Sequence, residues 1–265
     1  MSEQQAQTDE SQEERPLMEH LLELRNRLLR AVIGIVLVFI PLAFFASELF
    51  TWLSGPLLVH LPEGSSLIAT EVAAPFLAPF KLAIMTAVTI SLPWVLYQLW
   101  AFVAPGLYAN EQRLVLPLLA SSTGLFYLGM AFAYYVVFPL VFGFFVGITP
   151  TGVAVMTDIS RYLDFVLGMF MAFGVAFEVP VAIVLVVWAG FTTPKQLASY
   201  RAYIVVAAFG VGMVLTPPDV ISQTLLAVPI YLLYEVGLLA ARWMVPGIRE
   251  VEAQQAQAAQ DQNDN

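Results

Sequence analysis

The chain has 265 residues, of which 59% are hydrophobic and only 12% are charged, and its mean hydropathy is +0.78. Water-soluble domains carry about a quarter charged residues, so this composition excludes a soluble protein and predicts an integral membrane protein. The formal net charge of -9 comes almost wholly from the two ends, residues 1–19 and 249–265, and so says little about what the membrane part binds. The lack of cysteine excludes disulfides and thiolate metal sites.

The two ends of the chain are polar. Residues 1–15 and 249–265 are rich in Gln, Asp and Glu, and they hold too few apolar residues to offset the entropy of ordering. We therefore expect two disordered tails around a membrane domain that spans residues 16–248. The acidic start lacks the basic region of a cleaved signal peptide, so we expect the first span to be retained.

An amphipathic helix is predicted before the first apolar run. Leucines recur at helical spacing from Leu17 to Leu28, and Pro16 suits the first turn of a helix. The stretch HLLELRNRLLR, residues 20–30, places three arginines before the span, which suits a membrane anchor, but Glu23 does nothing for anchoring. One interpretation pairs Glu23 with Arg27 at i,i+4, which is worth about 0.3–0.5 kcal/mol.

Six apolar runs follow that can cross a bilayer, for which a helix needs about 20 residues. They cover about residues 29–50, 81–103, 114–138, 165–188, 202–216 and 220–241. The third is expected to end near Phe138, before a mostly apolar external loop, and the fifth is short. An even number of spans puts both termini on one side of the membrane. Most Lys and Arg residues fall on that side, with only Lys81 and Arg161 on the other, so both termini are predicted to be cytoplasmic.

Prolines recur within or near these spans, and each removes a backbone donor and crowds the preceding turn. They are Pro41, Pro93, Pro117, Pro180 and Pro229. The predicted fold is therefore an all-α integral membrane protein, with six transmembrane helices that are kinked by prolines and form a concave bundle. The general frequency of proline in membrane helices accounts for part of this pattern.

The sequence predicts no enzyme and no cofactor. His20 and His60 are the only histidines and fall on opposite sides of the membrane in this topology, so neither an HExxH pair nor a Ser-His relay can form. The chain also lacks the GxxxxGK[ST] loop that binds nucleotide phosphates.

Several acidic residues lie inside or beside the spans, where charge is costly. Glu111 lies in the short cytoplasmic loop GLYANEQR between the second and third spans. There Asn110 can cap the third helix, and a carboxylate in the first helical turn complements the helix dipole. Glu178 lies near mid-span, two residues before Pro180. If protonated, it can bond to a carbonyl that the proline leaves without a donor; a proton relay or partner contact is the alternative.

Two more acids fall in the last third of the chain. Asp219 follows Pro217-Pro218, where it can cap the sixth span, and Glu235 lies inside that span. We interpret both as structural or partner-docking residues.

Five motifs in order give the chain a family resemblance from about His20 to Trp243. They are HLLELRNRL, ATEVAAPFLAPFK, LPWVLYQLWAFVAPGLYANEQR, FMAFGVAFEVPVAIV and GMVLTPPDVISQTLLAVPIYLLYE. Together they resemble the TatC family, the multi-spanning subunit of the twin-arginine protein translocase. The resemblance implies a receptor for twin-arginine signal peptides in the bacterial cytoplasmic (inner) membrane, which exports folded proteins with the proton motive force and without nucleotide.

The resemblance also implies partners. These are single-span TatA- and TatB-type subunits, other copies of the chain and membrane lipid, with no nucleic acid. The fifth and sixth spans match the region where the single-span subunits dock.

The family's recognition carboxylates match Glu23 and Glu111. Two carboxylates suit two arginines, because a guanidinium binds a carboxylate through two parallel hydrogen bonds and lysine cannot reproduce that geometry. Arg25 would orient the site and Phe102 would line its approach. One departure from the family pattern is Gln112, which leaves a single basic residue after Glu111 where two are common.

Other matched positions concern the fold and transport. Pro56 matches a proline important to the family's fold, and Glu178 matches its intramembrane glutamate. Two rival interpretations stay open at this point. One is a proton-coupled secondary transporter of a small solute that uses Glu178, although the spans hold few polar residues for a hydrophilic cavity. The other is an assembly scaffold, in which Glu23 and Glu111 would be dispensable.

Overall fold

A computed structural model describes residues 3–51, 67–103, 115–148, 150, 156–216 and 220–245. Within these residues, five helical segments are long and apolar enough to cross a membrane, and Arg201–Leu215 is a shorter apolar helix. The long segments are Leu21–Phe44, Ala74–Phe102, Leu116–Phe145, Ile159–Trp188 and Val220–Met244. The predicted all-helical, multi-span class is confirmed. The chain divides into two compact units, Met1–Leu49 with Ala83–Thr123, and Phe50–Leu82 with Gly124–Asn265.

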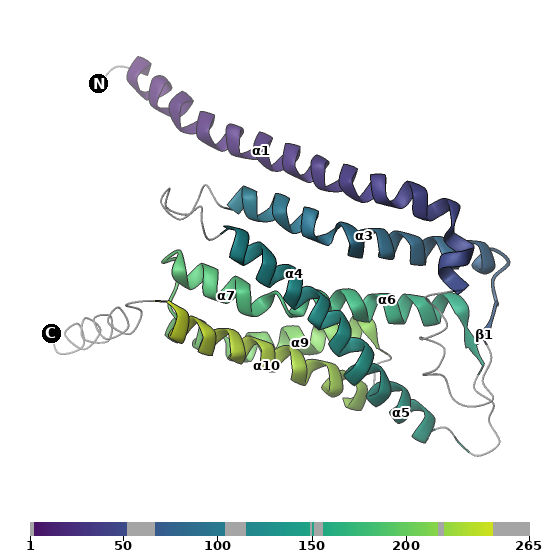
Figure 1. Ribbon diagram of the computed structural model, residues 1–265. Helices are drawn as coiled ribbons and strands as arrows, with labels where there is room; N and C mark the ends of the chain where they lie inside the picture. The colour runs from purple at the N-terminus through teal and green to yellow at the C-terminus, as the bar shows by residue number, and fades with distance from the viewer. Residues whose placement is uncertain are drawn as a thin grey trace, which may run out of the picture. The chain divides into compact units, whose positions relative to one another are not determined.

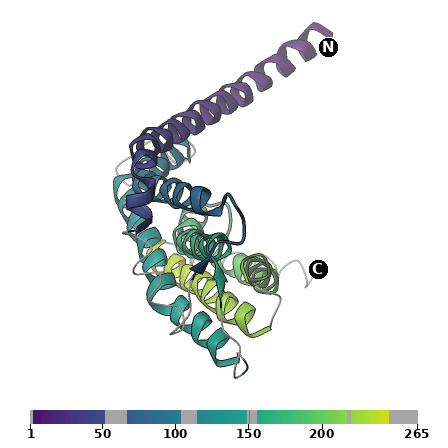
Figure 2. The ribbon, with the colours of Figure 1, turned by 90° about the vertical axis from the view of Figure 1, so that its right-hand side faces the viewer.

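The first unit is built on α1 (Glu3–Phe44), a long continuous helix in both ribbon views (Figures 1 and 2). Its helical start lies inside the segment 1–15 that the sequence predicts to be a disordered tail. That prediction weighed only the lack of apolar residues, whereas Gln, Glu and Ala are also good helix formers and extend a helix that the membrane span nucleates.

Helix α1 is fastened to α3 (Ala74–Val103) around Gly34. Trp94 donates from Nε1 to the carbonyl of Arg30 at 3.0 Å, and Ser91 donates from Oγ to the carbonyl of Gly34 at 3.5 Å. A Cβ at Gly34 would lie 2.6 Å from the Trp94 Nε1 atom, so the indole fits only because this residue has no side chain. These bonds span the turn from Arg30 to Gly34 and fix the helix that carries Glu23.

The second unit holds two hydrophobic clusters. The first gathers aromatic and aliphatic side chains from the turns after α4 (Val115–Phe132), from α6 (Ile159–Ala176) and, through Leu226, from the last helix. Phe138, Met169 and Phe173 are fully buried in it. The second cluster joins α7 (Val179–Trp188) to α10 (Val220–Met244). Helix α10 packs against α7 and against α9 (Arg201–Leu215). Gly237 allows close contact between α10 and α7, because a Cβ there would lie 2.9 Å from the Cα of Pro180.

The third span was predicted to end near Phe138, and this prediction is wrong. After α4 the chain forms a π-helical turn, η3 (Ala133–Val137), and continues as α5 (Phe138–Ile148) (Figure 1). Pro139 lacks a backbone N–H, which normally ends or kinks a helix. Here the widened turn precedes the proline, and the N–H of Phe138 bonds five residues back to Ala133, so the helix passes through.

Two predicted spans also begin too late. Helix α3 starts at Ala74 and α6 at Ile159, whereas the sequence places these starts at residues 81 and 165. Charged residues set the predicted boundaries, but Lys81 and Asp164 lie inside the helices and neutralise each other, with Nζ 2.7 Å from Oδ1. A charge near a helix end is therefore no boundary when a partner stands opposite it.

A short parallel pairing joins β1 (Leu67–Ile68) to β2 (Thr157–Asp158) at the start of α6. Asp158 caps α6 by accepting from the backbone N–H groups of Ser160 and Arg161 at 2.9 and 3.1 Å. Its other oxygen accepts from the N–H and the hydroxyl of Thr70 at 2.9 and 2.6 Å. These bonds, the Thr70 hydroxyl first, lower the pKa of Asp158 from its ordinary 3.8 to about 2. Asp158 therefore stays ionised and ties the segment after β1 to α6.

The remaining element is α8 (Pro194–Ser199), a short helix between α7 and α9. Thr193 caps it, and Gln196 completes a capping box. The hydroxyl of Tyr234, on α10, donates to the carbonyl of Leu197 at 2.6 Å, so this helix is held to α10.

Candidate functional site

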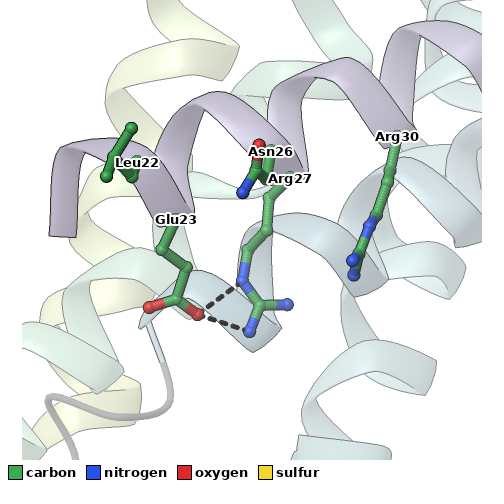
Figure 3. Close-up of a pocket in the computed structure, with 5 residues that line it drawn as sticks. All are labelled: Leu22, Glu23, Asn26, Arg27 and Arg30. Atoms are coloured by element: carbon green, nitrogen blue, oxygen red, sulfur yellow. Dashed lines mark hydrogen bonds and ion pairs between the residues drawn. The ribbon is translucent and has the colours of Figure 1, made fainter. Parts of the chain in front are cut away.

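A recess of about 380 Å³ lies on one face of α1 and is lined by Leu22, Glu23, Asn26, Arg27 and Arg30. Neighbouring positions in this set are one, three or four residues apart, so they share a face of the helix. Figure 3 shows Glu23, Arg27 and Arg30 extending to the same side of α1. The recess thus presents one carboxylate and two guanidinium groups, all carried by the helix that Trp94 fastens.

The carboxylate of Glu23 is held by Arg27, one turn further along. The Arg27 Nε and Nη2 atoms lie 2.8 and 2.6 Å from the same oxygen, Oε1 of Glu23 (Figure 3). None of the described residues donates to the second oxygen, Oε2. Both side chains are part-exposed, at 36% for Glu23 and 22% for Arg27. The i,i+4 ion pair predicted from the sequence is present, and it leaves half of the carboxylate available.

The other predicted recognition residues either lie away from the recess or fall outside the described residues. Arg25 is exposed on α1 and does not line the recess. Phe102 lies at the end of α3 and is half-buried. Glu111 and Pro56 lie outside the described residues, so the spacing between Glu23 and Glu111 stays a prediction.

The sequence did not identify Arg30 and Asn26 as lining residues, although their spacing from Glu23 and Arg27 carried that signal. Trp94 was also missed, because nothing in the local pattern of α3 says which turn of α1 it reaches.

Glu178 lies where α6 and α7 meet. The helix breaks over Phe177 and Glu178, and α7 restarts with Pro180 in its first turn. The backbone carbonyl of Glu178 accepts from Ala182 at 2.9 Å, and its side-chain Oε1 atom is buried. The side chain does not cap α7. Glu178 is thus a half-buried residue at a helix break, with one carboxyl oxygen buried.

Glu235 belongs to a second carboxylate–arginine pair. Arg201, at the start of α9, donates from Nε and Nη2 to the two oxygens of Glu235 on α10, at 2.6 and 2.8 Å. The hydroxyl of Tyr231 adds a bond of 2.8 Å to Oε1. This pair joins two helices, which favours the structural role proposed for Glu235. Asp219, the other predicted residue of this region, lies outside the described residues.

In the part of the chain that the structure describes, no three His, Cys, Asp or Glu side chains gather as a metal site would require. The groups that line the recess suit charge recognition: a carboxylate with one open oxygen can accept hydrogen bonds from a cation, and guanidinium is the cation that fits it best.

Comparisons with known proteins agree with this architecture. A model of the family "Sec-independent protein translocase protein (TatC)" matches residues 19–229. The chain is 57% identical to the Sec-independent protein translocase protein TatC of Haemophilus influenzae over 238 residues, which covers 90% of this chain and 92% of that protein. It is 56% identical to the protein of that name from Escherichia coli K12 over 230 residues, with 87% and 89% covered.

A solved structure gives the same result. The chain resembles the crystal structure of the twin-arginine translocase receptor TatC with a TM-score of 0.77 and 38% identity, over 84% of this chain and 98% of that one. This likeness and the family match support a translocase subunit over a solute transporter. A multi-pass membrane protein that shares more than half of its residues with translocase subunits, over most of both lengths, is a transport protein and no enzyme, and the chain belongs to the TatC family.

Proposed function

We propose that this chain is the signal-peptide receptor of a twin-arginine translocase and that it reads the paired arginines with Glu23 and Glu111. The observation that carries the proposal is the recess on α1, where Glu23 keeps its Oε2 atom open to a donor. A ligand guanidinium can form two parallel N–H bonds to a carboxylate, which gives both affinity and selection against lysine.

The charge of the recess explains why a second carboxylate is needed. Glu23 is the one acid among its lining residues and stands beside Arg27 and Arg30. A ligand with two guanidinium groups therefore meets a net positive surface, and another acid must compensate for it. Glu111 is the candidate, because it precedes the third span on the side of the membrane expected for Glu23.

The orientation is part of the proposal. The basic residues of α1, including Arg27 and Arg30, stand before its apolar part, Arg201 opens α9 and Arg242 lies in the last turn of α10. The positive-inside rule places these ends, and both termini, in the cytoplasm. A cytoplasmic recess is where a precursor would arrive before export, and the membrane is then the bacterial inner membrane.

The partners follow from the family. Single-span TatA- and TatB-type subunits are proposed to dock along α9 and α10, with other copies of the chain in the receptor complex. Helix α9 supports this proposal, because it is short and carries exposed apolar side chains such as Tyr203, Val206 and Val214. Its 15 residues span about 22 Å, less than the hydrocarbon thickness of roughly 30 Å. Folded proteins would pass through this assembly at the expense of the proton motive force.

The remaining residues have proposed supporting roles. Phe102 lines the approach to the site, Arg25 orients its charge, and Pro56 and Asp219 shape the segments on the opposite side. Glu178 acts after binding, in transport. Transport by Glu178→Gln would exclude a required ionised state, and transport by Glu178→Ala would exclude the role altogether.

Crosslinking tests the receptor role. A twin-arginine peptide that carries a photoreactive residue beside the arginine pair is added to purified protein, as the parent chain and with Glu23→Ala, Glu111→Ala or both. We expect crosslinking to fall with each single substitution and to vanish in the double variant. Asp164→Ala serves as the control, because it removes a carboxylate that pairs with Lys81 outside the recess.

A Lys-Lys peptide tests the geometry of recognition. It keeps both charges but cannot form the two-bond contact, so we expect little crosslinking to the parent protein. Undiminished crosslinking in the double variant, or equal crosslinking of the Lys-Lys peptide, contradicts the proposed site.

A further inference from the structure

We propose that Arg27 is a resident competitor at the recognition carboxylate: it occupies Glu23 while no peptide is bound and must be displaced before an arginine of the ligand can bind both oxygens. This inference rests on the proposed function and deepens it, because it concerns how the same site is kept exchangeable. Its basis is the contact of Arg27 Nε and Nη2 with Glu23 Oε1 at 2.8 and 2.6 Å.

The competitor has the chemistry of the ligand. Arg27 presents to Glu23 the guanidinium that a twin-arginine peptide would present. It stands four residues from Glu23 on the same helix, so the two groups remain neighbours however α1 moves. The competing group is therefore always at the site, whatever the concentration of peptide.

The contact is weak enough to be displaced. An exposed i,i+4 ion pair changes an equilibrium by only about twofold. Arg27 also engages one oxygen instead of two, which is not the parallel arrangement that gives arginine–carboxylate pairs their strength. A ligand guanidinium that takes both oxygens makes the better contact and can replace it.

Charge around the recess adds to the effect. While Arg27 remains on Oε1, a ligand guanidinium on Oε2 has a like charge beside it, and Arg30 lines the same recess. Removing Arg27 therefore relieves both competition and repulsion. The expected result is a gain in affinity, which generic damage to the protein would not produce.

The experiment uses the full chain, purified in lipid nanodiscs, and a fluorescent twin-arginine peptide. Equilibrium binding and dissociation rates are measured for the parent protein and for Arg27→Gln. We expect Arg27→Gln to bind about two- to fivefold more tightly, chiefly through slower dissociation. Arg27→Lys keeps the charge but loses the planar guanidinium group, so its gain in peptide affinity should be smaller. The melting temperature should change little, because the pair is part-exposed and lies within a single helix.

Two further variants separate the explanations. Arg242→Gln removes one positive charge from the last turn of α10 and should not raise the affinity for the peptide. A gain equal to that of Arg27→Gln would show that the effect comes from net charge alone. In Glu23→Gln the gain from Arg27→Gln should disappear, because nothing remains to compete for. A gain that persists there overturns the inference.

Failure of the competitor role and failure of the receptor site would give different binding results. If Arg27→Gln binds the peptide equally or more weakly while Glu23→Gln still loses binding, the receptor site stands and Arg27 is not a competitor. If Glu23→Gln binds as well as the parent protein, the site assignment itself fails, and the inference fails with it.

Discussion

The two carboxylate–arginine pairs of this protein use the same groups and are built differently. In Glu23–Arg27 both residues stand on α1, and two guanidinium nitrogens share one oxygen. In Glu235–Arg201 the residues come from α10 and α9, both oxygens are engaged, and Tyr231 adds a third bond. A pair between helices holds two elements together. A pair within one helical turn joins no second element, so its carboxylate remains available to bind another partner.

The helices that carry the two pairs also differ in how tightly they pack against their neighbours. Near Glu235, Gly237 brings α10 against the backbone of Pro180 in α7. On α1, which carries Glu23, the close contact at Gly34 is with the side chain of Trp94, which can move. We therefore expect substitutions around α10 to unfold the protein and substitutions around α1 to alter binding.

The largest effect is expected at Gly237. In Gly237→Leu the new Cβ would lie 2.9 Å from the Cα of Pro180, so α7 and α10 must separate. Overpacking of this kind costs about 3 kcal/mol. Thermal unfolding in detergent should show a clear loss of stability. Gly210→Leu is the matched control, because a Cβ at Gly210 meets nothing within 4 Å. Equal losses in the two variants would contradict the close packing of α10.

A smaller loss is expected at Gly34. In Gly34→Ala the methyl group would lie 2.6 Å from Trp94 Nε1, and the indole must shift at a cost of about 1 kcal/mol. Trp94→Ala should largely remove this cost, so stabilities in the double-mutant cycle should not add. Peptide binding should weaken in Gly34→Ala, since Trp94 fixes the helix that carries Glu23. Strict additivity would mean that the two residues are not in contact.

Exchanging the carboxylates for amides tests the comparison directly. Glu235→Gln weakens three hydrogen bonds and should lower stability by about 1 kcal/mol, whereas Glu23→Gln should cost less than about 0.5 kcal/mol. Peptide affinity should respond in the opposite order, with the larger loss in Glu23→Gln. If Glu23→Gln is instead the less stable of the two, the first pair is structural and the contrast fails.

The smallest effect concerns Asp158, a third and fully engaged carboxylate. Its pKa is lowered from 3.8 to about 2 by bonds from Thr70 and the start of α6. A lowered pKa means that the stability it contributes is present above its ordinary value and is lost as pH falls through about 2. Between pH 7 and 5 the melting temperature of the parent protein and of Asp158→Asn should therefore keep a constant difference, which should shrink below about pH 4. A difference that shrinks already at pH 6 would contradict this assignment.

Local rules predicted much of this molecule. Apolar length located the helices, and i,i+4 spacing predicted the Glu23–Arg27 pair that the structure shows. Motif order identified the family. These features depend on residues close in the chain, for which spacing is sufficient information.

Contacts between distant segments could not be predicted in this way. Lys81 and Asp164 were taken as boundaries because each alone is costly in a membrane, and their pairing is a tertiary fact. Trp94 meets Gly34 across two helices, and the partner of Glu235 is Arg201 on another helix. The meeting of Glu23 with Glu111 is of the same kind, and it stays a prediction.

The π-helical turn at Ala133–Val137 has a consequence for how the chain tolerates change in length. A π turn holds one more residue than an α turn, and one residue rotates a helix by about 100°. The extra residue thus sets the angular phase of everything that follows it, including Phe138 and Val141, which are buried. Deleting one residue here would restore a regular helix and turn those side chains away from their neighbours in α6. The packing of the buried side chains after the π turn therefore depends on keeping the extra residue.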